Sequence, residues 1–430
     1  MEKILIKNGR VLDPASKTDR KTDILIENGY IKRIGDDIVP TDKNTFVVYA
    51  DGLTVAPGLI DVHVHFRDPG FTYKEDIHTG SMAAKRGGFT TVVMMANTKP
   101  AMDNENVLKE VLGRAAAEDI SIFMVGNVTV RIAGKELTDF RALKEAGAKG
   151  LSDDGFPIID KELMRKALIR AKELDMIISL HEEDPRYIIR SGINAGPAAD
   201  AIDYGGADRR AEIEMVKRDI GLVRETGGAI DIQHISAGES VELVREAKKE
   251  GLKVYAEATP HHFTLTEDDV ERFGSNCKMN PPLREERDRL AIIEGLKDGT
   301  IDMIATDHAP HSAEEKSRDL KDAPSGIIGL ETSLALGITE LVHNEDMPLS
   351  TLIERMTHSP ARIYGLDKGY IAEGADADLV IFDENEEWIY DKSVSRSSNS
   401  PFLGWKLRGR VHYTIAQGRI VYDYEKEGNR

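Results

Sequence analysis

The middle of the chain alternates short apolar runs, typical of β-strands, with amphipathic helical stretches, and this alternation constrains the fold most. Eight such units lie between residues 54 and 367. The expected strand starts are Leu59, Thr90, Ile120, Ala148, Met176, Ile230, Lys253 and Ile301. Helical stretches are expected at 105–118, 161–174, 208–225 and 239–250. Repeated βα units indicate a parallel sheet, and eight of them fit an α/β protein with a (β/α)8 TIM barrel.

One of these stretches, 161–174, illustrates the helical pattern. Leu163, Ala167, Ala171 and Leu174 follow one another at spacings of four and three residues. This spacing places them on one face of a helix, which we predict to pack against the barrel.

Both ends of the chain consist instead of short apolar runs separated by turn dipeptides. Asn8-Gly9 and Asn28-Gly29 lie between such runs near the N-terminus, and Gln417-Gly418 does so near the C-terminus. Such dipeptides between apolar runs are hairpin signals. We therefore expect a small β domain assembled from residues 1–53 and 368–430, beside a barrel domain at 54–367.

Composition excludes several classes of protein. The chain has 75 acidic and 57 basic side chains, a net charge of −18, and no basic run, so neither a nucleic acid nor an anionic membrane surface is an expected partner. No apolar run approaches the length of a membrane helix, and the first ten residues do not form a signal peptide, so we expect a cytoplasmic protein. The one cysteine, Cys277, excludes an internal disulfide and a thiolate zinc site. A metal would have to be held by histidine and carboxylate.

Polar side chains follow the expected strands, at the end of the barrel where active sites lie. His63 and His65 are two residues apart on a strand, so both imidazoles project from the same face. Alone, this pair could be two ordinary polar strand residues. His181, His234 and Asp307 each end another expected strand, and imidazole with carboxylate is a donor set for zinc, so a metal site is favoured.

With these motifs the chain resembles the dihydroorotase family of the amidohydrolase superfamily over essentially its full length. The most specific matches are Asp61-Val-His-Val-His-Phe-Arg67 and Ala305-Thr-Asp-His-Ala-Pro-His311 followed by Lys316. The resemblance implies that the terminal β domain is a β-sandwich. It also implies one or two Zn²⁺ ions, with His63, His65 and Asp307 on one zinc, His181 and His234 on a second, and a bridging side chain after strand four.

The identity of the bridge is a choice between neighbouring residues. Many relatives use a carbamylated lysine, but one subgroup resembles Ser152-Asp-Asp-Gly155 and uses the second aspartate, which is Asp154 here. Strand alternation lets only one of Asp153 and Asp154 face the barrel axis, so the two compete. Asp154 is preferred, and a carbamylated Lys149 is the weaker alternative.

The resemblance also assigns roles in catalysis and substrate binding. Asp307 is implied to move the proton between the attacking water and the leaving ring nitrogen. Arg67 is implied to bind the substrate carboxylate, for which its planar fork is suited. The further substrate-binding residues that it implies are Asn97, Asn280, His311, Ser325 and Gly326. We expect Cys277 to be a buried small side chain and the charged stretch 314–321 to be either a solvated excursion or a lid.

The implied activity is the zinc-dependent, reversible cyclisation of N-carbamoyl-L-aspartate to dihydroorotate in de novo pyrimidine synthesis. Two alternatives stay open: another cyclic amidase, such as a hydantoinase or allantoinase, and an inactive scaffold for aspartate carbamoyltransferase. The expected ligand is a small molecule. A homodimer and an association with aspartate carbamoyltransferase are open as assemblies.

Overall fold

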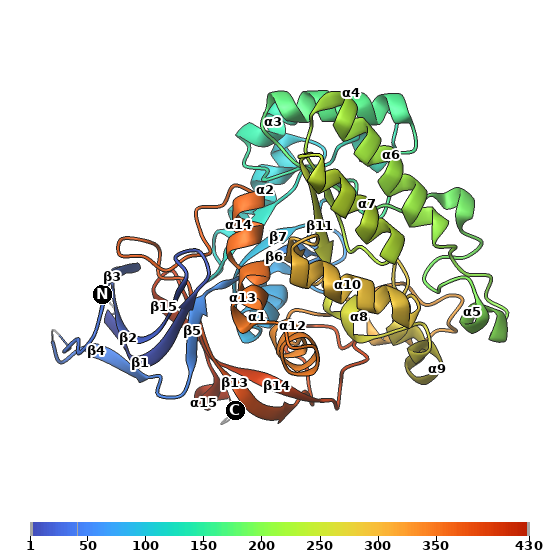
Figure 1. Cartoon of the computed structure of the whole chain (residues 1–430). Coiled ribbons are helices and arrows are strands. Elements are labelled where there is room, and N and C mark those ends of the chain that lie inside the picture. The colour runs from blue at the N-terminus through green and yellow to red at the C-terminus, as the bar shows by residue number, and fades with distance from the viewer. Residues whose placement is uncertain (1–2, 41, 428–430) are drawn as a thin grey trace.

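An eight-stranded sheet is built from both ends of the chain (Figure 1). The structure is a computed structural model that describes residues 3–40 and 42–427. The N-terminal strands are β1 (Lys3–Asp13), β2 (Thr18–Glu27), β3 (Tyr30–Gly35), β4 (Thr45–Tyr49) and β5 (Thr54–Pro57). The C-terminal strands are β13 (Leu379–Ile389), β14 (Lys406–Ala416) and β15 (Arg419–Asp423).

Strand β5 joins the two ends of the chain. The strand order is β15-β14-β13-β5-β1-β2-β3, with β4 also paired to β1. β5 pairs in parallel with β1 and antiparallel with β13, although it begins just after the domain boundary expected at residue 53. One layer of the core on this eight-stranded sheet is almost purely aliphatic, with buried side chains that include Ile6, Ile24 and Ile381.

Two of the three turn dipeptides form hairpins, but Asn8-Gly9 does not. Asn28-Gly29 connects β2 to β3 and Gln417-Gly418 connects β14 to β15. Asn8-Gly9 lies inside β1, at a register shift between Ile6 and Gly9, with Asn8 at φ 63°. A side chain at Gly9 would collide with Val55, since an added Cβ would lie 2.5 Å from its Cγ2. The dipeptide makes a bulge because β1 pairs with β4 before this point and with β5 after it.

The middle of the chain supplies seven parallel strands. They are β6 (Leu59–Val64), β7 (Phe89–Met94), β8 (Ser121–Met124), β9 (Ile178–Leu180), β10 (Ile230–Ile232), β11 (Val254–Ala258) and β12 (Met303–Ile304). They form the sheets β6-β7-β8 and β12-β11-β10-β9. The strand expected at Ala148 is reduced to Leu151, which bridges Gly126 and Ile178 in parallel, and His308 bridges Val64 in parallel. These bridges connect the two sheets at both edges.

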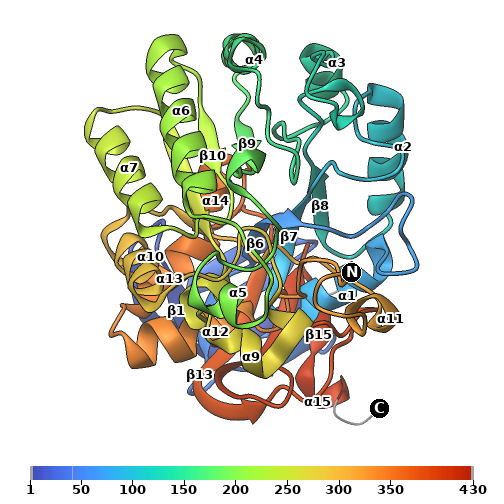
Figure 2. The same cartoon turned by 90° about the vertical axis from the view of Figure 1, so that its right-hand side faces the viewer.

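Helices follow the parallel strands and cover them from outside. Figure 2 shows α2, α3, α4, α6 and α7 in an arc around the strands. The helices up to α7 are α1 (Ile77–Arg86), α2 (Glu105–Ala115), α3 (Phe140–Glu145), α4 (Lys161–Glu173), α5 (Pro197–Ala201), α6 (Arg210–Thr226) and α7 (Gly238–Lys249). The later ones are α8 (Pro260–Thr264), α9 (Asp269–Phe273), α10 (Glu286–Asp298), α11 (Ala313–Lys316), α12 (Ser333–Leu336), α13 (Leu349–Met356), α14 (His358–Ile363) and α15 (Tyr424–Glu427). No helix within the described ranges has the length and apolarity needed to cross a membrane.

The buried face of α4 differs slightly from the sequence prediction. Ala167 and Ala171 are buried as predicted, together with Met164 and Leu168, while the outer members of the predicted face, Leu163 and Leu174, are only half-buried. Met164, Ala167, Leu168 and Ala171 have the i, i+3, i+4, i+7 spacing of one helical stripe. The buried face of α4 is therefore rotated slightly from the predicted one. Ala167 and Ala171 belong to both faces, so they did not distinguish between them.

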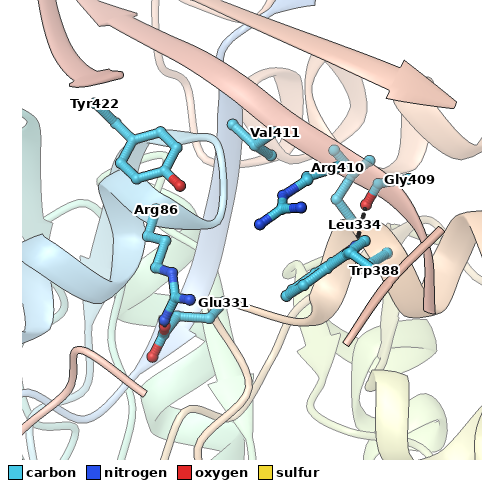
Figure 3. Close-up of a pocket in the computed structure, with 9 residues that line it drawn as sticks. Arg86, Glu331, Leu334, Trp388, Gly409, Arg410, Val411 and Tyr422 are labelled. Carbon is cyan, nitrogen blue, oxygen red and sulfur yellow. Dashed lines mark hydrogen bonds and ion pairs between the residues drawn. The ribbon is translucent and has the colours of Figure 1, made fainter. Parts of the chain in front are cut away.

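A small cavity lies where the terminal sheet meets α1 (Figure 3). Arg86 of α1 pairs with Glu331 at 2.5 Å, and Trp388 Nε1 donates to the Gly409 carbonyl oxygen across β13 and β14. The volume of the cavity, about 20 Å³, accommodates a water molecule but no substrate. This contact therefore attaches the terminal sheet to the helices and is not a functional site.

Candidate metal centre

Four histidines and two aspartates meet at the carboxyl ends of the parallel strands. His63 lies near the end of β6 and His65 follows this strand, His181 follows β9, His234 follows β10, Asp307 follows β12, and Asp154 follows Leu151. All six side chains are buried. Because parallel strands end at one edge, five segments distant in sequence bring their polar side chains to one point.

The distances define two overlapping groups of ligands. Asp307 Oδ1 lies 3.0 Å from His65 Nε2 and 3.5 Å from His63 Nε2. Asp154 Oδ1 lies 3.7 Å from His63 Nε2, 3.7 Å from His181 Nδ1 and 3.9 Å from His234 Nε2. The groups His63–His65–Asp307 and His63–Asp154–His234 each have ligand atoms within 4.8 Å of one another. The Asp154 carboxylate thus lies within 3.9 Å of a ring nitrogen of each of the four histidines.

The outward nitrogens of three of these imidazoles are held by hydrogen-bond acceptors. His63 Nδ1 lies 3.0 Å from Glu257 Oε2, His65 Nδ1 lies 3.0 Å from Asn97 Oδ1, and His181 Nε2 lies 2.9 Å from Glu183 Oε2. An N–H directed to an outer acceptor leaves the lone pair of the other nitrogen free for a metal. The inward His63 Nε2 is buried and has no hydrogen-bond partner. Donor types and orientation therefore fit a zinc site.

The carboxylates around His63 dominate its electrostatics. Burial alone would lower the pKa of His63, but the adjacent Glu257, with Asp307 and Asp154 behind it, outweighs burial and raises that pKa to about 10. The cluster therefore attracts positive charge, which a divalent cation would supply.

Three residues of the site have left-handed backbone conformations, which residues other than glycine rarely adopt. Arg67 has φ 58°, His234 has φ 34° and Asp307 has φ 46°. Such conformations cost on the order of 1–3 kcal/mol each and cluster at functional sites. The fold accepts this strain where it directs three polar side chains into one cavity.

The structure separates the three candidate bridging residues. Asp153 accepts hydrogen bonds from Val128 N at 2.9 Å and Thr129 N at 3.1 Å, outside the cluster, and burial raises the pKa of its carboxyl to about 6. Lys149 Nζ lies 4.9 Å from the centre of the Phe123 ring. Of the three, Asp154 is the one that lies among the histidines.

A cavity of about 470 Å³ opens over the cluster. Its wall contains every residue that the sequence analysis assigned to metal or substrate binding except His63, which is fully buried. The wall residues that the sequence predicted are His65, Arg67, Asn97, Asp154, His181, His234, Asn280, Asp307, His311, Ser325 and Gly326. The cavity is thus continuous from the metal ligands to the residues expected to bind a substrate.

One side of this cavity is positively charged. The Arg67 guanidinium donates to the Pro310 carbonyl oxygen at 3.2 Å and lies 3.4 Å from His311 Nε2. Lys74 Nζ lies 3.1 Å from His311 Nδ1. Burial, together with these two cations, lowers the pKa of His311 to about 2, so the imidazole is neutral. Arg67 therefore presents a positive charge at this wall, suited to a carboxylate.

The charged stretch after β12 is only partly solvated. Glu314 is exposed, but Lys316 is buried and its Nζ donates to the carbonyl oxygens of Pro324 and Gly326, both at 3.0 Å. Cys277 is buried, as expected.

Sequence reasoning missed Glu257 and Lys278. Glu257 could have been found, because it is a charged residue inside the apolar strand β11. Lys278 lines the cavity and its Nζ donates to the carbonyl oxygens of Leu320 and Ala323, at 2.8 Å and 2.6 Å. Backbone partners more than forty residues away leave no pattern in the sequence.

Comparison with known proteins gives consistent matches. The model of the Amidohydrolase family matches residues 54–421. A dihydroorotase of Clostridioides difficile is 54% identical over 420 residues, which is 98% of this chain and 100% of that protein. A dihydroorotase of Lactococcus lactis is 53% identical over 420 residues, 97% of this chain and 99% of that protein.

The solved structures show a similar fold at lower identity. The L-hydantoinase (dihydropyrimidinase) from Arthrobacter aurescens superposes with a TM-score of 0.88 at 26% identity, covering 98% of this chain and 96% of that one. A D-hydantoinase from a Thermus species gives a TM-score of 0.84 at 26% identity, covering 98% and 95%. Together with the family match, these structures show an α/β fold of the TIM-barrel type.

Proposed function

The chain belongs to the amidohydrolase family, and we infer that it catalyses the dihydroorotase reaction. This is the reversible cyclisation of N-carbamoyl-L-aspartate to (S)-dihydroorotate and water, a step of de novo pyrimidine synthesis. The observation that carries this function is identity near one half, over nearly the whole length, to dihydroorotases. A cavity with a metal-binding cluster at its base and Arg67 in its wall agrees with it.

The detailed architecture is part of the proposal. We propose a closed (β/α)8 barrel, in which Leu151 represents the fourth strand and the His308–Val64 bridge completes the circle. Residues 54–367 would form this catalytic domain, and residues 1–53 with 368–430 a β-sandwich domain. Strand β5 pairs with the terminal sheet and leads directly into β6, so it would be the junction between the two.

We propose that the cluster holds one or two zinc ions. His63, His65 and Asp307 would bind one, His181 and His234 the other, with Asp154 between them. Zinc at this place would polarise the ring carbonyl and promote ionisation of the attacking water. Glu257, Asn97 and Glu183 hold the outward imidazole nitrogens, so the ligands keep their orientation.

Asp307 is proposed to move the proton. Burial by itself would raise its pKa, but the hydrogen bond from His65 and the surrounding imidazoles hold the pKa of this carboxyl well below its usual range. Its carboxylate is therefore ionised and lines the cavity. In ring opening it would accept the proton of the attacking water and donate it to the leaving ring nitrogen, and in ring closure the order is reversed.

The positive wall of the cavity is proposed to bind the substrate carboxylate. Arg67 would form the paired hydrogen bonds for which its guanidinium is suited, beside Asn97 and His311. Asn280 and the backbone of Ser325 and Gly326 line the same cavity and would position the rest of the ring.

The function is tested by measuring ring opening of dihydroorotate, hydantoin and allantoin, and cyclisation of N-carbamoyl-L-aspartate, on purified protein with counted zinc. We expect dihydroorotate to be opened and N-carbamoyl-L-aspartate to be cyclised, with the other two rings much poorer substrates. Opening of hydantoin or allantoin but not dihydroorotate would refute the assignment, and inactivity of zinc-loaded protein on all of them would favour a scaffold.

Location and assembly are proposed in outline. We propose a cytoplasmic enzyme acting on a small molecule. Light scattering of the purified chain tests whether it is a homodimer. Repeating the measurement with aspartate carbamoyltransferase added tests for a complex.

A further inference from the structure

The segment between β13 and β14 leaves the terminal sheet and contacts the loop that carries Arg67. Arg396 Nη1 donates to the Thr72 carbonyl oxygen at 2.9 Å, and Ser397 Oγ donates to the Lys74 carbonyl oxygen at 2.7 Å. Residues 72–74 belong to the loop after His65 that also carries Arg67. The C-terminal part of the chain therefore contacts the cavity loops directly.

Asn399 makes the most specific of these contacts. Its side chain is buried and forms hydrogen bonds to two loops. Oδ1 accepts from His311 N at 3.1 Å, and Nδ2 donates to the carbonyl oxygens of Ala309 and Gly326, both at 3.0 Å. Its own carbonyl oxygen accepts from Ile328 N at 3.0 Å. One amide thus holds the loop after β12 against the segment around Gly326.

The two loops are in close contact at Gly326. Gly326 has φ 122°, and an added Cβ would lie 2.7 Å from the Ala309 Cβ and 3.3 Å from His311 Nε2. The Gly326 carbonyl oxygen also accepts from Lys316 Nζ at 3.0 Å. His311 Nε2 in turn lies 2.8 Å from the Ser325 carbonyl oxygen. Small shifts of either loop would therefore change the shape of the substrate wall.

We propose that Asn399 is a positioning residue of the substrate site, which fixes His311 and Gly326 at the separation that fits the substrate carboxylate. This inference rests on the proposed function, because it takes the ligand at this wall to be a ring carboxylate. Asn399 does not line the cavity and acts through the two loops. The terminal sheet thereby contributes to substrate selection as well as to stability.

The test compares Asn399→Ala and Asn399→Asp with a matched control, Ser400→Ala. Ser400 is the next residue, is buried to the same extent, and bonds only within its own segment, where its Oγ accepts from Phe402 N. Asn399→Asp keeps the acceptor for His311 N but places a second carboxylate oxygen against two carbonyl oxygens. Steady-state kinetics with dihydroorotate, inhibition by orotate and by uracil, zinc content and thermal unfolding are measured on each.

We expect both Asn399 variants to retain zinc and to raise KM for dihydroorotate about 10- to 100-fold, with a smaller change in kcat. Inhibition by orotate, which carries the ring carboxylate, should weaken by a similar factor. Inhibition by uracil, which lacks it, should stay within about twofold of the unsubstituted chain, and Ser400→Ala should match that chain throughout. A general structural role would instead weaken both inhibitors equally or leave KM unchanged, and either result would overturn the proposal.

Lys316→Met is a second test at the Gly326 carbonyl oxygen, which accepts from both Lys316 and Asn399. It removes the other donor to the Gly326 oxygen and should also weaken orotate inhibition more than uracil inhibition. If all three variants fail to fold while Ser400→Ala folds, the role is structural and the proposal is wrong. Inactivity of the unsubstituted chain on dihydroorotate would refute the proposed function, whereas an unchanged orotate-to-uracil ratio in an active enzyme refutes this inference alone.

Discussion

The cluster of histidines and aspartates and the interior of the terminal sheet are both buried, but the first consists of ionisable side chains and the second of aliphatic ones. The sheet buries aliphatic side chains such as Ile6, Ile24 and Ile381, and burying these stabilises the fold. The cluster buries imidazoles and carboxylates, which is costly unless they are paired or bind a metal. The terminal sheet therefore stabilises the fold, whereas the cluster lowers stability and provides a binding site.

Substitution within the cluster should have the largest effect. Asp307→Asn keeps the size of the side chain but removes the proposed proton carrier, so we expect kcat for dihydroorotate to fall about 10²- to 10⁴-fold. Because the change is isosteric, circular dichroism and the unfolding midpoint should remain close to those of the unsubstituted chain. Substantial residual turnover with bound zinc would contradict the proton-transfer role.

The adjacent aspartates provide a sharper contrast within the site. Asp154→Asn should lower the zinc content and abolish most activity, because this carboxylate lies within 3.9 Å of a ring nitrogen of each of the four histidines. Asp153→Asn should retain zinc but lose about 1–3 kcal/mol of unfolding free energy, since its hydrogen bonds to Val128 and Thr129 are buried. Metal analysis and thermal unfolding separate them, and zinc loss from Asp153→Asn alone would reverse the assignment.

Arg67→Met should have an intermediate effect. Loss of a charge-assisted hydrogen bond costs about 1.5–3 kcal/mol, so KM for dihydroorotate should rise about 10- to 100-fold while kcat changes less. Zinc content should not change, because Arg67 is not among the groups of metal ligands. An unchanged KM would remove Arg67 from the carboxylate site.

Substitution in the terminal sheet should affect stability and leave turnover intact. Ile381→Ala empties a fully buried position and should cost about 2–5 kcal/mol of unfolding free energy. Ile389→Ala, on the same strand but 60% exposed, is the control and should change stability by about 0.5 kcal/mol or less. Denaturant unfolding and kcat at low temperature test this, and a large fall in kcat for folded Ile381→Ala would mean that the two regions are not separable.

Much of the site could be predicted because its residues follow local patterns. The two-residue spacing of His63 and His65 places both imidazoles on one face, and His181, His234 and Asp307 lie at the ends of expected strands. The rule that parallel strands present their carboxyl ends together then joins them in space. The β-rich ends and the βα middle of the fold could also be predicted, because each has a local sequence pattern of its own.

The remainder depended on contacts between distant backbone groups. Lys278 and Asn399 bond to carbonyl oxygens of loops whose paths no local pattern encodes. Asn8-Gly9 has the composition of a hairpin turn but forms a bulge, because β1 changes partner from β4 to β5 at that point. Strand alternation alone left Asp153 and Asp154 open, and the preference for Asp154 came from the family resemblance; the hydrogen bonds of Asp153 to Thr129 are a contact that no local pattern encodes.

The pairing of β5 with β13 has a consequence for how the chain folds. Val55 pairs with Ile381, so strands made at the start of synthesis must wait for a partner that is made near its end. Contacts of such high sequence separation form slowly, and until then the aliphatic faces of β1 and β5 are exposed to aggregation. A nascent chain released before β13 would therefore have intact histidines and aspartates but an unfinished sheet, and would depend on chaperones for its survival.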